Sequence, residues 1–240
     1  MALDMLLRRG SRSQAKEEHW IPLSDLMTGL MMMFMLIAII FMLKVEADSQ
    51  KVKDVARIYD EMRTDLYKDL REEFKEDLPR WGAELDKNLA LRFKSPDVLF
   101  DSNRSDLKPG FIQILNDFFP RYVRILTSKK YRAAIEEIRI EGHTSTVWSG
   151  ATSVSDAYFK NMELSQSRTR SVLQHVLSEG KVASEQDWLK THLTANGLSS
   201  SKPILKPSGA EDMIKSQRVE FKVRTNADER IAAILRTAEQ

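Results

Sequence analysis

The 240-residue sequence contains no cysteine, which excludes a disulfide framework and thiolate metal sites. It also lacks a strong charge of either sign. The formal net charge is +2, so the composition gives no case for direct nucleic-acid binding. Long apolar runs are equally scarce, and only residues 20–43 form one. About 197 residues follow this run, which is enough for one domain and a helical spacer.

The apolar run predicts a single transmembrane helix at 20–43, preceded by a polar tail at 1–19. Residues 21–43 span ~35 Å as an α-helix, whereas a bilayer core of ~30 Å needs ~20 apolar residues. Val45-Glu46-Ala47 resembles a small-residue cleavage site, but a secretory apolar region has only ~7–15 residues. We therefore expect an uncleaved anchor. Positive charges flank both ends of the run, so the positive-inside rule leaves its orientation open.

One acid, Asp25, lies just inside the apolar run. An ionisable side chain within a membrane segment suggests a functional site. However, Pro22 and Ser24 are typical of a helix start, where an acid stabilises the positive end of the helix dipole. From these residues alone, Asp25 is either a helix cap or a functional carboxylate.

Residues 44–87 predict a long helix that links the span to the rest of the chain. Glycine and proline are absent from 44 to 78, and Pro79 ends the pattern. The helix either docks on its own domain or pairs with a second copy of the chain. The spacing of its apolar residues is close to that of a coiled-coil seam, which favours pairing. The apolar stripe comprises Val45, Val52, Val55, Tyr59, Met62, Leu66, Leu70, Phe74 and Leu78.

Residues 88–240 predict an α/β domain. Alternating apolar and polar residues indicate strands near 89–93, 137–141, 193–195 and 219–224. Helical patterns cover 109–126, 158–177 and 227–237. Because strands and helices alternate, we expect one sheet covered by helices. The loops 144–157 and 198–216 are long enough to suggest a function.

No catalytic constellation is visible, since the sequence lacks H-E-x-x-H, G-x-S-x-G and a phosphate loop. His143, at a strand end, is more typical of a structural histidine than of a base. Asn161, Leu164, Ser165 and Arg168 share one helix face. Their donors suggest a receptor for a small carboxylate. Alternatively, Asn161 and Ser165 cap the helix and Arg168 is a surface residue. We predict no enzyme, metal site or cofactor.

Several motifs, in order, resemble the OmpA-like peptidoglycan-binding domain over residues 88–225. They are Val98-Leu99-Phe100-Asp101-Ser102, Leu107-Lys108-Pro109-Gly110, Ile140-Glu141-Gly142-His143-Thr144, Asn161-x-x-Leu164-Ser165-x-x-Arg168 and Gln217-Arg218-Val219-Glu220. The resemblance implies a mixed sheet and binding of the diaminopimelate group of the peptidoglycan stem peptide. It assigns this binding to His143, Thr144, Ser145, Asn161, Leu164, Ser165 and Arg168.

The binding motif departs from the family at one position. The family has Gly-His-Thr-Asp, and its Asp and helix Arg hold the two ends of the amino acid. Arg168 is in place, but Ser145 replaces the Asp. Asp156 is a nearby acid that we consider as a substitute.

A second resemblance covers the N-terminal segment. Trp20-x-x-x-x-Asp25-Leu26-Met27-Thr28-x-Leu30-Met31 is similar to the single span of MotB-type B subunits of ion-driven stator motors. This implies that Asp25 takes up and releases H⁺ or Na⁺, with Thr28 one turn along. It also implies a homodimer inside a ring of five multi-span A subunits, with residues 44–58 as a possible plug. The N-terminus would be cytoplasmic, and the C-terminal domain would lie in the periplasm, outside the bacterial inner membrane.

Within this group, the long Ser145–Tyr158 loop and the stretch around Asn161 resemble the ZorB family of Zorya anti-phage defence systems. That resemblance implies a ZorA-like A subunit as partner and a role in defence. The alternatives are a flagellar stator subunit and a purely structural anchor that tethers the membrane to the cell wall.

Overall fold

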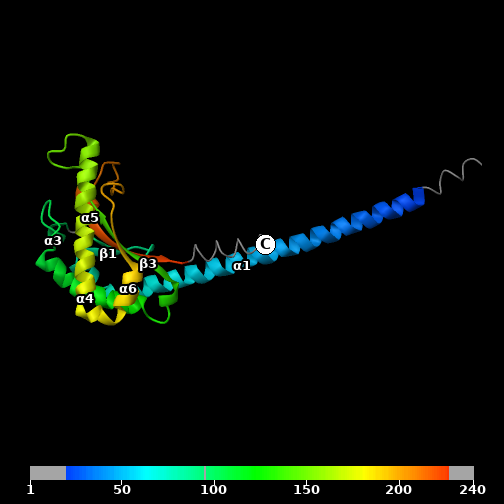
Figure 1. Ribbon diagram of the computed structural model, residues 1–240, viewed down its shortest axis with the longest axis horizontal. Coiled ribbons are helices and arrows are strands. Elements are labelled where there is room, and N and C mark those ends of the chain that lie inside the picture. The colour runs from blue at the N-terminus through cyan, green and yellow to red at the C-terminus, as the bar shows by residue number, and fades with distance from the viewer. Residues whose placement is uncertain (1–19, 95, 227–240) are drawn as a thin grey trace, which may run out of the picture. The chain divides into compact units, whose positions relative to one another are not determined.

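The computed structural model describes residues 20–94 and 96–226 (Figure 1). The chain divides into two compact units, whose described parts are residues 20–54 and residues 55–226 without residue 95. The predicted closing helix at 227–237 lies outside the described residues, as does the tail at 1–19.

The described residues form these elements: α1 (Trp20–Phe74), α2 (Asp77–Arg80), β1 (Ala83–Leu85), β2 (Ala90–Phe93), α3 (Pro96–Leu99), α4 (Pro109–Leu126), η2 (Arg132–Ala134), β3 (Ile135–His143), α5 (Val154–Ser178), η3 (Gly180–Glu185), α6 (Gln186–His192), β4 (Leu193–Gly197), α7 (Met213–Ser216) and β5 (Arg218–Thr225). The strands make one 5-stranded sheet in the order β1-β2-β5-β3-β4. Only the β3–β4 pair among them is parallel. The predicted mixed α/β sheet is confirmed.

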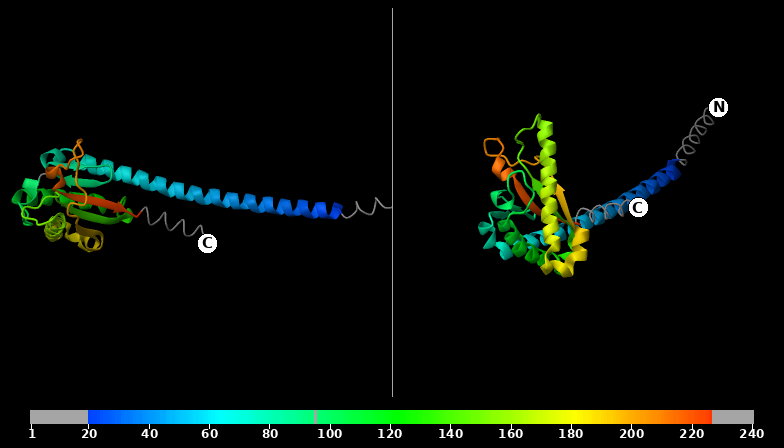
Figure 2. Two further views of the ribbon diagram at one scale, coloured as in Figure 1. Left: turned by 90° about the horizontal axis from the view of Figure 1, so that it is seen from above. Right: turned by 60° about the vertical axis from the view of Figure 1, so that its left-hand side comes forward.

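The parallel pair requires a crossover, and α5 supplies it. It packs against β3 and β4, and the right-hand view of Figure 2 shows it in front of the sheet. Glycines allow this close approach. A Cβ atom added to Gly197 would lie 2.3 Å from the backbone nitrogen of Gln166, and one added to Gly142 would lie 2.6 Å from Thr169 Cγ2.

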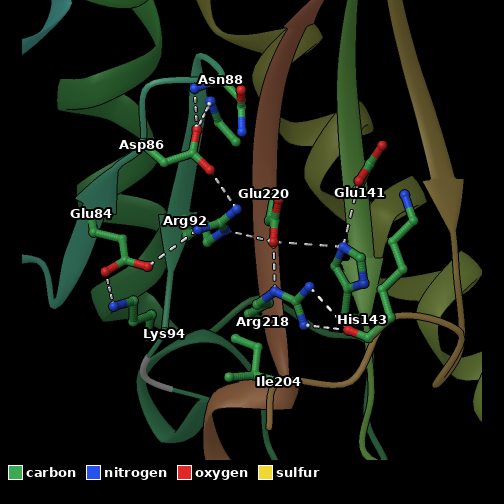
Figure 3. A network of polar contacts seen from close by, with 12 residues as sticks. Glu84, Asp86, Asn88, Arg92, Lys94, Glu141, His143, Ile204, Arg218 and Glu220 are labelled. Carbon is green, nitrogen blue, oxygen red and sulfur yellow. Dashed lines mark hydrogen bonds and ion pairs between the residues drawn. The ribbon is translucent and has the colours of Figure 1, made fainter.

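Alternation along the strands gives the sheet two different faces. Phe93, Ile140 and Phe221 point into the core, where Phe221 packs edge-on to Phe118 of α4 with ring centroids 5.1 Å apart. Charged residues occupy the intervening positions, so the opposite face of β2, β5 and β3 carries a polar network (Figure 3).

The C-terminal end of α1 belongs to the core of the domain. Leu66, Leu70 and Phe74 are 0% exposed, and Phe74 packs against Phe118 with ring centroids 5.4 Å apart. The guanidinium of Arg121 on α4 donates to Glu73 Oε1 at 2.8 Å. The prediction that this part of the stripe pairs with a second copy is therefore wrong. The domain also begins before residue 88, since α1 and β1 contribute to it.

The predicted helix at 109–126 is confirmed at both ends. Pro109 stands at its first position, where a missing amide hydrogen is harmless. The helix predicted from residue 158 begins earlier, at Val154, because the Ser153 side chain caps it by accepting from the amide of Asp156 at 3.1 Å. The long loop after β3 consequently covers only 144–153.

Candidate functional site

Asp25, the predicted ion carrier, lies inside α1. The helix is described from Trp20, so Asp25 is more than one turn from its first described residue. The alternative that Asp25 caps the helix is wrong, because a cap satisfies amides of the first turn. Thr28 lies on the same face at i+3, and its hydroxyl donates to the carbonyl of Ser24 at 2.8 Å. Toward other partners the Thr28 oxygen is therefore an acceptor.

Apolar side chains surround this part of α1 on every side. The large apolar residues between Leu23 and Leu43 are 45–71% exposed. A helix that is apolar all round lies in a membrane or among other helices. By length and composition, α1 is the one helix among the described residues that could cross a membrane.

The motif on α5 faces inward and holds the surrounding loops. Asn161 Nδ2 donates to the carbonyl of Ser145 at 3.1 Å, which fixes the loop after β3. Ser165 Oγ accepts from the amide of Ser199 at 3.0 Å, which fixes the loop after β4. Asn161 and Ser165 are buried in the middle of α5, so the alternative that they cap the helix is wrong.

Arg168 holds a further loop, the one between Phe100 and Leu107. Its guanidinium donates to the carbonyls of Arg104 at 2.9 Å and Asp101 at 3.2 Å, and it lies over the ring of Phe100. Burial lowers the pKa of Arg168 to about 10. Arg168 is 9% exposed, so it is not the surface residue of the alternative interpretation. In this structure it stabilises the loop rather than presenting a free cation.

His143 points toward the polar network rather than toward α5 (Figure 3). Its Nε2 lies 3.6 Å from Glu141 and 3.9 Å from Glu220, and burial lowers its pKa. The neighbouring imidazole, with Lys202 and Lys222, holds the pKa of Glu141 at about 2. His143 is thus a buried, neutral side chain in a charged environment.

Glu220 is the centre of this network. Its Oε1 accepts from Arg218 at 2.6 Å and from Arg92 at 2.9 Å. Burial alone would raise the pKa of Glu220, but the hydrogen bond and charge of Arg218 outweigh it and lower the pKa. Arg218 also donates to the carbonyl of Lys202, which ties the loop after β4 to the sheet.

The same cluster has the residue types of a metal site. Glu141, His143 and Glu220 place potential ligand atoms within 4.8 Å of one another. However, the Glu220 oxygen nearest His143 already binds two guanidinium groups. A cation bound there would be repelled by both at short range. We therefore interpret the cluster as a charge network that stabilises the fold.

The position at which the family has an aspartate carries no carboxylate here, because it is Ser145, which follows Thr144. Both are buried, and their backbones are engaged by Asn161 and Ser199. Asp156 is also engaged, because its carboxylate accepts from the amide of Thr152 at 2.8 Å and from Lys160 at 2.9 Å. The amide of Thr152 is the main cause of the lowered pKa of Asp156. Asp156 thus stabilises the start of α5.

Leu164 differs from the other motif residues because it lines a cavity of about 310 Å³ beside α5. The cavity also has walls from the Phe100–Leu107 loop and from Trp148 in the loop after β3. The sequence motif did not indicate Trp148, Lys160 or Glu163, which also line it. Lys160, Glu163, Leu164 and Ser167 follow the same helical spacing as the motif, and each lies one residue before a motif position.

No family model matches the chain. The chain is 50% identical to the Zorya protein ZorB of Escherichia coli over 219 residues, which cover 91% of this chain and 92% of that protein. Among solved structures, it is similar to a MotB-like protein of Desulfovibrio vulgaris, with 26% identity, a TM-score of 0.49 and coverage of 70% of this chain and 94% of that one. The periplasmic domain of Helicobacter pylori MotB follows with 22% identity, a TM-score of 0.44 and coverage of 65% and 97%. Both TM-scores lie below 0.5, whereas the sequence match to ZorB extends over nearly the whole of both chains.

Proposed function

The chain belongs to the ZorB family, and from this premise we propose that it is the B subunit of an ion-driven motor in the bacterial inner membrane. The 50% identity to ZorB over 91% of the chain carries the proposal. The resemblance to Zorya systems implies that the motor serves anti-phage defence rather than motility. The role is mechanical and involves no enzymatic step by this chain.

We assign the ion-carrying step to Asp25. A carboxyl group can accept a proton from the periplasmic side and release it to the cytoplasmic side, so that one elementary charge crosses the membrane. Each elementary charge that crosses gains ~2.3 kcal/mol per 100 mV, which is enough to bias a conformational step. Asp25 lies in a segment of α1 whose apolar side chains are exposed and pack against no other described part of the chain. In the assembled motor, lipid, a second copy of the chain and the transmembrane helices of an A subunit would bury these side chains.

The domain at 55–226 provides the fixed point in this proposal. A motor develops torque only if one part is held, and attachment to peptidoglycan outside the membrane would hold the B subunit. This requires a cytoplasmic N-terminus and a periplasmic C-terminal domain.

Asp25→Asn tests the proposal, because it removes the titratable proton and keeps the size and polarity of the side chain. We expect loss of phage protection with unchanged membrane levels of the protein. Asp60→Asn is the matched control, since Asp60 is an exposed acid of α1 beyond both the apolar run and residues 44–58. Phage protection that survives Asp25→Asn would exclude the ion-carrier role and leave a purely structural anchor.

A further inference from the structure

A groove separates part of α1 from the end of β5. Its volume is about 420 Å³, and both sides belong to the compact unit that starts at residue 55. Leu89 and Val223, which are 1% and 5% exposed, supply apolar surface on the sheet side. Ala56 and Tyr59 supply it on the helix side, where they share a face at i and i+3. An occupant of the groove would therefore join the helix to the sheet.

The rim of the groove carries more positive than negative charge. Among the described residues that line it, the cations are Arg63, Lys222 and Arg224, and the one acid is Asp60. Asp60 already pairs with Arg63 at 3.3 Å. Lys222 makes no ion pair within the part of the chain that the structure describes. The rim consequently suits an occupant that brings a carboxylate.

The chain leaves the described residues at this groove. Thr225, the last residue of β5, lines it. The next residue, Asn226, is fixed to η2, because its amide donates to the carbonyl of Ala134 at 3.1 Å and its Nδ2 to that of Ala133 at 3.1 Å. Residues 227–240 therefore start beside the groove.

This following segment lies outside the described residues, and its sequence predicts an amphipathic helix. It contains neither glycine nor proline. Ile231, Ile234 and Leu235 are spaced at i, i+3 and i+4 and would form one apolar face. Asp228 lies three residues before Ile231 and would border this face, whereas Glu229 lies two residues before it and would point away. An apolar face with one acid at its edge complements a groove with an apolar lining and a positively charged rim.

We propose that residues 227–237 form a helix that docks in this groove of the same chain and clasps α1 to β5. Ile231 packs against Tyr59, and Asp228 pairs with Lys222. The occupant is a segment of the chain itself, because the chain enters the groove directly from β5 and needs no further linker to reach it.

The clasp lengthens the part of α1 that the domain holds. Among the described residues, Leu66 is the first fully buried residue of α1. Docking as far as Ala56 extends the held part by ~15 Å toward the N-terminal end of the helix. In the proposed motor, α1 connects the span to the anchoring domain, so a longer held part leaves less helix free to bend. The contact itself does not depend on the motor function.

Disulfide trapping in the full-length protein in membranes tests the clasp, and the absence of native cysteine removes any background. The test variant combines Ala56→Cys with Ile231→Cys. The matched control combines Ala56→Cys with Ala233→Cys, because residue 233 lies two positions on and would face away. Under mild oxidation we expect the test pair to form an intrachain disulfide about tenfold faster than the control, since bridged cysteines need Cα atoms within ~7 Å and Cβ atoms that face each other. Peptide mass spectrometry identifies the bridge, and non-reducing gels report any link between chains.

The acid at the edge of the apolar face gives an independent readout. Asp228→Lys in the test variant should slow disulfide formation about fivefold, since an exposed ion pair contributes up to ~1 kcal/mol. Glu229→Lys should leave the rate unchanged. Equal rates for the test and control pairs would overturn the clasp, and so would a disulfide that links two chains. Equal effects of Asp228→Lys and Glu229→Lys would refute the contact with Lys222.

Discussion

Replacing Leu66 by alanine tests whether the apolar stripe of α1 docks on its own domain or pairs two chains. Leu66 is 0% exposed and belongs to the core of the domain. Truncation of a fully buried leucine removes its transfer free energy and leaves a cavity, at a cost of about 2–5 kcal/mol. Ile58 of the same helix is 58% exposed. Its truncation removes the same number of carbon atoms, but we expect a change within ~0.5 kcal/mol.

The assay is urea unfolding of a fragment that begins at Val55, where the compact unit starts. If the stripe docks on its own domain, the midpoint is independent of protein concentration. If it pairs two chains, unfolding is coupled to dissociation, and tenfold dilution lowers the stability by ~1.4 kcal/mol. A concentration-dependent midpoint that Leu66→Ala abolishes would refute the docking of α1 on the domain.

Further predictions concern the sheet. Gly197→Ala places a Cβ atom 2.3 Å from the α5 backbone and should destabilise the domain by at least ~1–3 kcal/mol in thermal melts, whereas Gly180→Ala, with nothing within 4 Å, should be neutral. His143 has its pKa lowered from 6.5 and Glu141 from 4.5 to about 2, so the folded state binds fewer protons than the unfolded state. Thermal stability should therefore fall as the pH drops below about 6.5, and again from about 4.5 toward 2. His143→Gln should flatten the upper step and also reduce the lower one, because the imidazole is the main cause of the low pKa of Glu141; an unchanged profile would contradict a buried neutral imidazole.

Much of the fold follows from local patterns. Alternation in Val219, Phe221 and Val223 predicts β5, and Pro109 marks the first residue of α4 as the structure has it. The start of α5 is harder to predict, because Ser153 and Asp156 are equally typical of a loop. β1 has only 3 residues and gives no usable periodicity.

The partner of an apolar stripe is not a local property. Met62 to Phe74 and the preceding positions of α1 share one spacing, yet the C-terminal part packs on α4. Phe74, for example, packs against Phe118, which is more than forty positions away, and the helical period carries no information about such contacts. Sequence spacing therefore predicted the helix correctly and the packing of its C-terminal part incorrectly.

The same ambiguity applies to the site on α5 and decides how mutations there should be interpreted. Asn161, Ser165 and Arg168 hold loops, so their loss would disturb every wall of the cavity that those loops form. Such variants should weaken all ligands together and lower the stability of the domain. Glu163 is exposed, lines the cavity and holds no loop, so Glu163→Gln should leave the stability of the domain unchanged. A loss of wall binding in an Arg168 variant is therefore no proof that its guanidinium touches the ligand, because only altered discrimination reports direct contact.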